Sequence, residues 1–549
     1  MNTLLHIDNL STDIQLSDRI IPAVKRVSLQ VHQGETVALV GESGSGKSIT
    51  ALSIARLLPD AGRVTSGQVL LHNENLLAKS ERAMRSIRGN RIAMIFQEPM
   101  TSLNPVIKIG QQIIESILLH ERLSKTQAKQ RCLSLLDAVG LPEPARNMAE
   151  YPHQLSGGMR QRVMIAIALA TNPELLIADE PTTALDVTIQ AQVLALLKSL
   201  QEQRNMGMIF ITHDLGVVQQ IADRVIVMRH GEIVENALSA DFFKAPQHAY
   251  SQQLLNALPS MEKRGLKLSD HTHSVDQQNS ADFSQQAILK VDHLVVHFPI
   301  KAGVLKTTVG HVKAVNGVSF ELNPGRTLAL VGESGCGKTT VGKSILQLLS
   351  VTAGAIEFSG DNLLALKGEQ LLNKRRDLQI IFQDPYSSLN PRMLIGDIIE
   401  EGMIALGADS LASERSAEID ELLHQVGLPE DARNRYPHEF SGGQRQRICI
   451  ARALAVKPKV IICDEPTSAL DVSVQAQVLN LLKDLQNKLG MSYLFITHDM
   501  AVVSYLADDV AVMNEGVIVE QGSVQEVLTQ PKHAYTKRLL SAVPHVSTG

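Results

Sequence analysis

The chain has 549 residues, of which 44% are hydrophobic and 20% charged, and its formal net charge is −5. At roughly 150 residues per domain this length predicts about three or four compact domains, and the ordinary composition excludes a disordered tail or a fibrous repeat. The negative net charge argues against a protein held mainly by nucleic-acid phosphates. The longest uninterrupted apolar run, Val163–Ala170, has eight residues, whereas a membrane-spanning helix needs about 20.

Two features of the sequence predict the compartment. The N-terminus lacks a basic stretch followed by an apolar segment, so no secretory signal is expected and residence in the cytoplasm is predicted. The four cysteines stand far apart with no Cys-x-x-Cys spacing. This pattern predicts buried free thiols rather than a disulfide framework or a metal cage.

The sequence contains two copies of one domain. The octapeptide Gly41–Ser48 recurs as Gly332–Thr339, and over the 47 positions of Leu155–Gln201, 31 residues are identical to those of Phe440–Gln486. Identity of this extent indicates duplication of a whole domain. A polar, aperiodic stretch separates the copies, which predicts a first domain with a short C-terminal extension (1–260), a flexible linker (261–287) and a second domain with a short C-terminal extension (288–549).

Within each copy, short apolar runs of strand length alternate with longer stretches of helical spacing. In the first copy these runs are Thr36–Val40, Leu175–Ala178 and Met208–Ile211, and each precedes a turn. The alternation predicts an α/β fold with a parallel sheet that helices cover on both faces. The segment from Ile109 to Val139 has helical spacing and no strand, which predicts a mostly helical insertion in the middle of each copy.

Both copies contain the pattern Gly-x-x-x-x-Gly-Lys-Ser/Thr between a predicted strand and a predicted helix. Glycines there allow backbone N–H groups to surround phosphate oxygens, and the helix N-terminus adds its positive end. The lysine is expected to reach the β- and γ-phosphates and the hydroxyl to face Mg²⁺. The alternative, a glycine-rich turn without a ligand, would have to occur twice in the same context. The predicted nucleotide-binding residues are Gly41, Glu42, Ser43, Gly44, Ser45, Gly46, Lys47, Ser48 and Ile49 in the first copy, and Gly332, Glu333, Ser334, Gly335, Cys336, Gly337, Lys338, Thr339 and Thr340 in the second.

An apolar strand in each copy ends in a pair of carboxylates, Asp179-Glu180 and Asp464-Glu465. An aspartate at a strand end beside a phosphate loop suits a Mg²⁺ partner, and the following glutamate can orient or deprotonate an attacking water. Acidic pairs are also common on surfaces. Their order after the phosphate loop favours the functional interpretation.

A Ser-Gly-Gly run lies 23 residues before each of those aspartates, counted from the serine. The two runs are Ser156-Gly157-Gly158 and Ser441-Gly442-Gly443. A serine that caps the N-terminus of an apolar helix creates a second anion site. A single domain has no obvious use for two phosphate sites.

The ordered motif set resembles that of the ATP-binding cassette (ABC) ATPases, and it covers nearly the whole chain twice. The set consists of the phosphate loop, Gln97 and Gln383, Ser-Gly-Gly, Asp-Glu, Ala184-Leu185-Asp186 and Ala469-Leu470-Asp471, and finally His213 and His498. The resemblance implies two tandem P-loop NTPase domains, each with a parallel-sheet core, an antiparallel β subdomain and a helical subdomain. It also implies ATP and Mg²⁺ as ligands.

The resemblance further implies a head-to-tail sandwich, in which each nucleotide lies between the phosphate loop of one copy and the Ser-Gly-Gly of the other. Glu180, Glu465, His213 and His498 would be catalytic, although each histidine follows an apolar strand and could simply cap it. Mg²⁺ would be held by Ser48, Gln97 and Asp179 at one site and by Thr339, Gln383 and Asp464 at the other.

The two sites differ at the position where members of this family stack an aromatic ring on adenine. Alignment places Phe298 there in the second copy but Ile14 in the first. The loss of an aromatic stack is worth about 0.5 to 1.5 kcal/mol, or about two- to tenfold in affinity. We therefore expect weaker nucleotide binding at the first site.

Several further motifs resemble the peptide/nickel importer branch. They are Ser-Leu-Asn-Pro at 102–105 and 388–391, Tyr-Pro-His at 151–153 and 436–438, and His-Ala-Tyr at 248–250 and 533–535. This resemblance implies a fused two-cassette ATPase at the cytoplasmic face of the bacterial inner membrane, with two integral membrane permease subunits and a periplasmic substrate-binding protein as partners. The cargo stays open among oligopeptides, dipeptides, nickel and peptide-like antibiotics.

Two other functions compete with transport. A soluble twin-cassette ATPase acting on ribosomes or nucleic acid usually has basic arms and a long charged helical linker, whereas this linker is short and mixed and no nucleic-acid partner is expected. A regulatory scaffold that binds ATP without turnover is disfavoured by the two glutamates.

Overall fold

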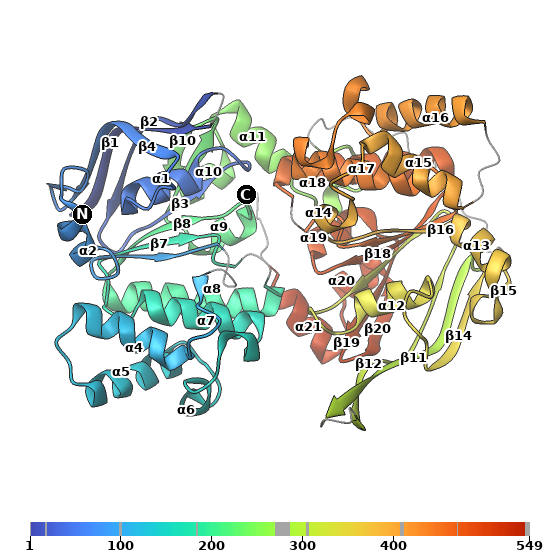
Figure 1. Cartoon of the computed structure of the whole chain (residues 1–549), viewed down its shortest axis with the longest axis horizontal. Coiled ribbons are helices and arrows are strands. Elements are labelled where there is room, and N and C mark those ends of the chain that lie inside the picture. Colours follow the sequence, from blue (N-terminus) through green and yellow to red (C-terminus); the bar gives the residue numbers. More distant parts are fainter. Residues whose placement is uncertain are drawn as a thin grey trace. The chain divides into compact units, whose positions relative to one another are not determined.

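The computed structural model describes residues 2–16, 19–97, 102–182, 185–268, 286–302, 307–406, 411–468 and 470–543. By its internal contacts the chain divides into two compact units, with the boundary between Leu255 and Asn256. Both units have the same architecture, in which a six-stranded, mostly parallel sheet accompanies a four-stranded antiparallel sheet and a group of helices (Figure 1). This arrangement confirms the predicted α/β class.

The six-stranded sheet of the first unit has the order β10–β9–β3–β8–β7–β6, in which only β10 is antiparallel to its neighbour. Its strands are β3 (Thr36–Val40), β6 (Ile92–Ile95), β7 (Leu175–Asp179), β8 (Gly207–Ile211), β9 (Arg224–Arg229) and β10 (Glu232–Leu238). The antiparallel sheet consists of β2 (Ile20–His32), β1 (Thr3–Gln15), β4 (Gly62–Leu71) and β5 (Glu74–Asn75).

The helices of the first unit include the predicted insertion, which forms α4 and α5. They are α1 (Lys47–Ala55), α2 (Glu81–Ile87), α4 (Ile109–His120), α5 (Lys125–Ala138), α6 (Pro144–Asn147), α7 (Gly157–Ala168), α8 (Val187–Arg204), α9 (Leu215–Ile221), α10 (Ser239–Lys244) and α11 (Ala249–Asn256).

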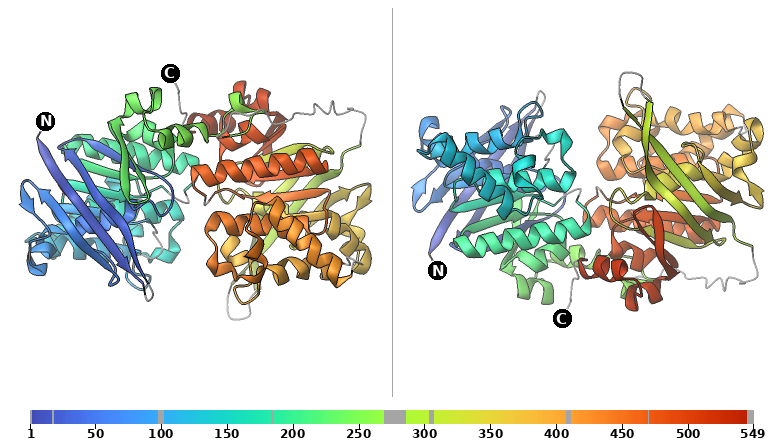
Figure 2. Two further views of the ribbon diagram at one scale, coloured as in Figure 1. Left: turned by 90° about the horizontal axis from the view of Figure 1, so that it is seen from above. Right: turned by 90° about the horizontal axis from the view of Figure 1, so that it is seen from below.

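The second unit repeats this plan with the sheet order β16–β17–β18–β13–β19–β20. Its strands are β13 (Thr327–Val331), β16 (Leu378–Ile381), β17 (Val460–Asp464), β18 (Ser492–Thr497), β19 (Asp509–Asn514) and β20 (Val517–Ser523), with β11 (Leu289–Ala302), β12 (Thr307–Leu322), β14 (Ala353–Phe358) and β15 (Asp361–Asn362) in the antiparallel sheet. Its helices are α12 (Lys338–Ile345), α13 (Gly368–Asp377), α14 (Pro385–Ser388), α15 (Ile395–Ala405), α16 (Ala412–Gln425), α17 (Gly442–Leu454), α18 (Val472–Leu489), α19 (Met500–Leu506), α20 (Val524–Thr529) and α21 (Ala534–Ser541). The long paired strands of each antiparallel sheet are dark blue and yellow-green in Figure 2.

Side chains that alternate along the central strands explain why the parallel sheet packs against the antiparallel sheet on one face and against helices on the other. On β7, Leu175 and Ile177 pack in the cluster that includes the antiparallel sheet, whereas Leu176 and Ala178 pack in the cluster that includes α4 to α8. Successive strand residues point to opposite faces, so an uninterrupted apolar strand is buried on both. The side chains at the carboxyl ends of these strands are thereby fixed on a rigid support.

The segment that begins at Asn256, the last residue of α11, belongs to the second unit. We call Asn256–Leu268 the crossover segment. Its Ala257 and Leu268 side chains are each 1% exposed and lie in the same hydrophobic cluster as Leu482 of α18. The predicted flexible linker thus differs from the structure in its first eight residues, because apolar side chains in an otherwise polar stretch find a core.

Polar contacts also hold the crossover segment. Arg264 donates to the carbonyl of Ala507 and to Asp508 Oδ1, the latter at 2.7 Å. Tyr505 Oη donates to the Leu266 carbonyl at 2.8 Å, and the Lys267 ammonium pairs with a carboxylate of α18 at 2.8 Å. None of the helices in the described part of the chain combines the length and the apolar character that a bilayer crossing needs.

Candidate functional site

Neighbouring strands bring the predicted motifs to one edge of each sheet. In the first unit the carboxyl ends of β3, β8, β7 and β6 lead into the phosphate loop, His213, Asp179-Glu180 and Gln97, respectively. Parallel strands end at the same edge, and that edge is the usual ligand position in such sheets. The second unit presents its phosphate loop, His498, Asp464-Glu465 and Gln383 in the same order.

Each phosphate loop requires glycine immediately before its helix. Gly46 and Gly337 have φ angles of 101° and 108°. A Cβ atom on them would lie 2.5 Å from the carbonyl oxygen of Ala23 and 2.2 Å from that of Ala314. Only glycine permits this approach of loop and strand, so the N–H groups at the start of α1 and α12 are presented at the sheet edge.

The loop lysine is buried and held by the loop itself. Lys47 Nζ donates to the carbonyls of Gly41 at 2.7 Å and Glu42 at 2.9 Å. In the second unit the Lys338 ammonium makes the same two bonds, at 2.7 Å to Gly332 and 2.9 Å to Glu333. The ammonium charge is therefore fixed inside the curve of the loop.

A hydroxyl and a carboxylate meet beside each lysine. Ser48 Oγ donates to Asp179 Oδ1 at 3.0 Å, and Thr339 Oγ1 donates to Asp464 Oδ1 at 2.9 Å. Burial raises the pKa of Asp179 to about 6 and also raises the pKa of Asp464, although the hydroxyl hydrogen bonds oppose both shifts. A cation bound here would favour the ionised carboxylates.

These oxygen groups fit Mg²⁺, which prefers one or two protein oxygens and completes its shell with water and phosphate oxygens. Within the described ranges, no group of three or more His, Cys, Asp or Glu side chains could hold a metal ion alone. Gln97 and Gln383, also predicted as metal ligands, direct their side-chain N–H₂ groups to the neighbouring glutamates.

The glutamate after each aspartate is held at both carboxylate oxygens. Gln97 Nε2 donates to Glu180 Oε2 at 2.9 Å, and His213 Nδ1 lies 3.4 Å from Glu180 Oε1. The corresponding distances from Gln383 and His498 to Glu465 are 2.7 and 3.1 Å. The structure therefore joins the predicted glutamate, glutamine and histidine in one cluster per unit.

Backbone strain and electrostatics distinguish these glutamates. Both have a φ of 46°, a left-handed conformation that non-glycine residues adopt at a cost of about 1–3 kcal/mol and that is concentrated at functional sites. Burial alone would raise the pKa of Glu465, but the hydrogen bond and charge of His498, together with Lys338 and Gln383, lower it overall. Burial opposes protonation of His498, yet Glu465 raises its pKa, so this carboxylate is kept ionised.

The Ser-Gly-Gly runs are not part of these clusters but begin α7 and α17 in the helical subdomains. Ser156 Oγ accepts from the N–H of Met159 at 3.3 Å, and Ser441 Oγ caps its helix in the same way. A Cβ atom on Gly157 would meet no atom within 4 Å, whereas one on Gly158 would lie 2.8 Å from Ile189. Gly442 and Gly443 show the same contrast, so one glycine of each pair faces open space at a helix N-terminus.

Ile14 and Phe298 occupy equivalent places in the antiparallel sheets. Ile14 pairs with Ile21 of β2, and Phe298 pairs with Val312 of β12. Two residues further along β2 and β12 lie the alanines whose carbonyls approach Gly46 and Gly337. The Phe298 ring is 39% exposed, so this side chain is accessible near the phosphate loop.

Sequence reasoning singled out the two His-Ala-Tyr runs without giving them a role. Their tyrosines, Tyr250 and Tyr535, each accept a hydrogen bond from the phosphate loop of their own unit. The recurrence of the His-Ala-Tyr run in both copies was the feature of the sequence that could have indicated a role for these tyrosines. Ala184 and Ala469 of the predicted Ala-Leu-Asp motifs lie outside the described residues.

The fold and the clusters define a P-loop nucleoside triphosphatase with two cassettes in one chain. The family model described as "ABC transporter" matches residues 24–183 and 315–468. The family model described as "Oligopeptide/dipeptide transporter, C-terminal region" matches residues 234–282 and 519–549.

Individual relatives extend this result. A solved structure, "Dimeric structure of a post-hydrolysis state of the ATP-binding cassette MJ0796 bound to ADP and Pi", shares 31% identity, covers 43% of this chain and 98% of its own, and has a TM-score of 0.40. The chain is 50% identical to the glutathione import ATP-binding protein GsiA of Pectobacterium atrosepticum, over 98% of this chain and 89% of that protein. It is also 50% identical to the peptidoglycan transport ATP-binding protein YejF of Agrobacterium fabrum, over 98% of this chain and 96% of that protein.

By the family match and these two relatives, the chain belongs to the ABC transporter family, as an ATP-binding protein with two fused cassettes. This membership confirms the predicted family and the predicted ATPase activity. An ATP-binding subunit of a transporter acts with membrane-spanning partner subunits.

Proposed function

We propose that the chain hydrolyses ATP at two composite sites and thereby drives import of oligopeptides or peptide-like compounds. The first site would use Lys47, Ser48, Gln97, Asp179, Glu180 and His213 together with Ser441, Gly442 and Gly443. The second would use Lys338, Thr339, Gln383, Asp464, Glu465 and His498 together with Ser156, Gly157 and Gly158. The open glycine at each Ser-Gly-Gly helix start supports this assignment, because it leaves room for a phosphate that its own cluster does not need.

The observation that carries the proposal is the pair of glutamates held at both oxygens. A carboxylate fixed by Gln383 and His498 and kept ionised can take a proton from a water molecule that attacks the γ-phosphate. The loop N–H groups and Lys338 would bind the phosphates, and the histidine would orient the glutamate. Mg²⁺, held by Thr339 and Asp464, would neutralise charge on the β- and γ-phosphates.

Replacing both glutamates tests this role. In the full-length E180Q/E465Q variant, ATP should stay bound while turnover falls about 10²- to 10⁴-fold, the range expected for loss of a general base. Equilibrium binding of a fluorescent ATP analogue and phosphate release measure the two quantities.

The matched control is E232Q/E515Q, which changes one exposed glutamate per unit outside the clusters. Its turnover should equal that of the unsubstituted chain. Turnover within a few fold of normal in E180Q/E465Q would contradict the assigned role.

The proposed cargo and partners are supported by the likeness of the chain to proteins of peptide transport. Both copies carry the region that matches oligopeptide and dipeptide transporters, and the two named relatives are described as acting on glutathione, which is itself a tripeptide, and on peptidoglycan. We therefore assign to the chain two integral membrane permeases, a periplasmic substrate-binding protein and a position on the cytoplasmic face of the inner membrane. A deletion strain tested for growth on defined di- and oligopeptides would identify the cargo.

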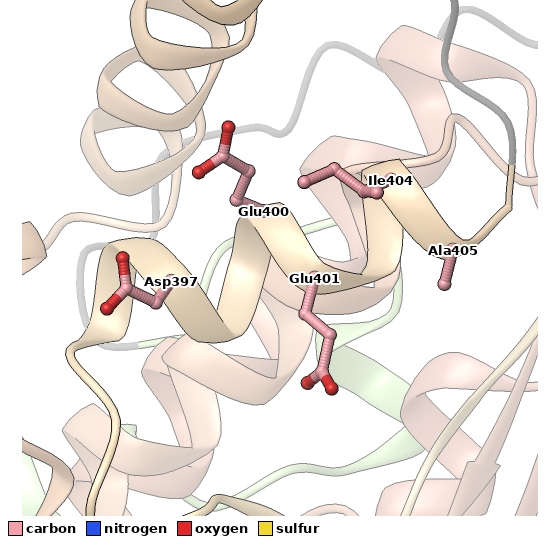
Figure 3. A pocket seen from close by; sticks show the side chains of 5 residues that line it. All are labelled: Asp397, Glu400, Glu401, Ile404 and Ala405. Atoms are coloured by element: carbon pink, nitrogen blue, oxygen red, sulfur yellow. The ribbon is translucent and has the colours of Figure 1, made fainter.

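The permeases are proposed to dock on the helical subdomains. Leu119 near the end of α4 is 74% exposed and Ile404 near the end of α15 is 59% exposed. Beside Ile404, a pocket of about 400 Å³ is lined by α15 alone, and Glu400 and Glu401 point to opposite sides of that helix (Figure 3). Glu400 pairs with Arg415 at 2.9 Å, so Ile404 and the Glu401 carboxylate suit a partner segment that carries both apolar and basic residues.

In the second unit α14, which precedes α15 in the chain, contacts the Ser-Gly-Gly helix. Arg445 of α17 lies over the Tyr386 ring of α14 at 3.9 Å, and Arg452 of α17 donates to the Ser388 carbonyl at 2.6 Å. Movement of α14 by a docked partner would therefore be transmitted to the helix that Ser441 caps.

The competing function, a soluble twin-cassette ATPase acting on ribosomes or nucleic acid, receives no support from the comparisons, since the transporter region is present in both copies. Purification of the chain with its native partners distinguishes the two functions. Two membrane proteins are expected, and ribosomal particles would favour the alternative.

A further inference from the structure

A tyrosine from the C-terminal extension is hydrogen-bonded to the phosphate loop in each unit. Tyr250 Oη accepts from the backbone N–H of Glu42 at 3.3 Å. Tyr535 Oη accepts from the backbone N–H of Glu333 at 3.0 Å. Both tyrosines are buried, with exposures of 3% and 5%, and both lie in the region that matches the oligopeptide/dipeptide transporter C-terminal family.

The loop lysine holds the same peptide group from its other side. The Gly41 carbonyl, which accepts from Lys47 at 2.7 Å, and the Glu42 N–H belong to one planar peptide unit. In the second unit the Gly332 carbonyl accepts from Lys338 at 2.7 Å. Tyrosine and lysine together therefore fix the orientation of the first peptide plane of each loop.

The tyrosine is itself anchored. The N–H of Tyr250 donates to His248 Nδ1 at 3.1 Å, and the backbone N–H groups of Gln247 and His248 donate to the carboxylate of Glu235 on β10, at 2.8 and 3.1 Å. The Arg229 guanidinium lies over the Tyr250 ring at 4.6 Å. The hydroxyl position is thus determined by the strand that begins the extension, not by the loop.

The second unit contains the same anchor. The N–H of Tyr535 donates to His533 Nδ1 at 3.2 Å, and Glu520 of β20 accepts from the N–H groups of Lys532 and His533 at 2.7 and 3.0 Å. Burial raises the pKa of Tyr535 to about 12, so its hydroxyl stays neutral. The same contacts occur in both units although the two phosphate loops differ in sequence, with Ser45 in the first and Cys336 at the equivalent position of the second.

We propose that Tyr250 and Tyr535 are positioning residues for nucleotide binding, which set the first peptide plane of the phosphate loop and thereby the ATP affinity of their own site. The C-terminal extension then serves the nucleotide site of each cassette. This inference rests on the proposed nucleotide sites.

Substitution by phenylalanine removes only the hydroxyl and leaves the loop N–H without its buried acceptor. Loss of one such hydrogen bond should raise the Kd for ATP about two- to tenfold at the affected site. Y250F is measured in the full chain with site two disabled by K338A, and Y535F with site one disabled by K47A. KM should rise by the same factor in hydrolysis assays, with kcat within about twofold, because the glutamate cluster is untouched.

The control is Y493F, a buried tyrosine whose hydroxyl donates to the Leu482 carbonyl at 2.9 Å, outside the loop. It should lower the Tm of the nucleotide-free protein and leave the Kd unchanged, whereas Y250F and Y535F should raise the Kd. A purely structural role predicts a lower Tm with unchanged Kd and KM in all three variants, and that result would overturn the inference.

If the unsubstituted chain bound no ATP, the proposed function would fail as well, whereas normal binding that neither substitution alters would overturn this inference alone.

Discussion

At the residue scale, the clearest difference between the two sites is Ile14 against Phe298. I14F should raise the affinity of the first site for ATP about two- to tenfold, because an aromatic ring can stack on adenine. Ile14 Cδ1 lies so close to Gly62 that a Cβ atom on this glycine would be only 3.2 Å away from it. Titration in a K338A background isolates the first site.

The reverse substitution provides the control for this prediction. F298I in a K47A background should weaken the second site by a similar factor. Equal affinities at the two unsubstituted sites would contradict the expected asymmetry.

Motif residues were predictable because their chemistry is local. The glycines, Lys47 and Ser48 stand in one octapeptide, and their arrangement follows from a strand, a turn and a helix. The contact of Tyr250 with Glu42 was not predictable, since it spans 208 positions and depends on how the extension returns to the sheet edge. The pairing of Gln97 with Glu180 depended in the same way on strand order.

At the element scale, apolar runs located the central strands well. The expected strand Thr36–Val40 matches β3, and the expected Leu175–Ala178 extends by one residue to Asp179. The long helical insertion was also predicted, because its spacing excluded strands. The crossover segment was not, because Ala257 and Leu268 are too few and too far apart to give a periodic signal.

The packing of the crossover segment into the second unit can be tested by substitution of Leu268. L268A should destabilise the second unit by about 2–5 kcal/mol, the range for loss of a fully buried leucine. Chemical denaturation of the full chain, followed by amide hydrogen exchange in α18 and α19, measures the change. L489A, at a 57% exposed position of α18, should have an effect within about 0.5 kcal/mol, and equal effects of the two substitutions would show that Leu268 contributes no core packing.

At the scale of the whole molecule, duplication supplies each cassette with one cluster of glutamate, glutamine and histidine and one Ser-Gly-Gly helix. ATP that bridges a cluster and the helix of the other cassette should draw the units together. In E180Q/E465Q with Mg²⁺ and ATP, the radius of gyration should therefore fall towards about 24 Å, the value for a compact chain of 549 residues. Small-angle scattering measures it.

A variant that lacks both loop lysines, K47A/K338A, should show no such compaction under the same conditions. If the ATP-bound E180Q/E465Q protein had the same radius as the nucleotide-free protein, the composite arrangement would be wrong.

The crossover segment also determines where the gene can be split into separate subunit genes. A break directly after α11, at Asn256, would keep Ala257, Leu268 and the Arg264 contacts in the polypeptide that needs them to complete its interior. A break after Leu268 would leave those residues attached to the wrong product, from which they could reach the second cassette only by association between chains. Two halves that fold independently are therefore expected only if the chain is divided at the end of α11. The thirteen residues of the crossover segment follow the first repeat in the sequence but belong to the tertiary structure of the second unit.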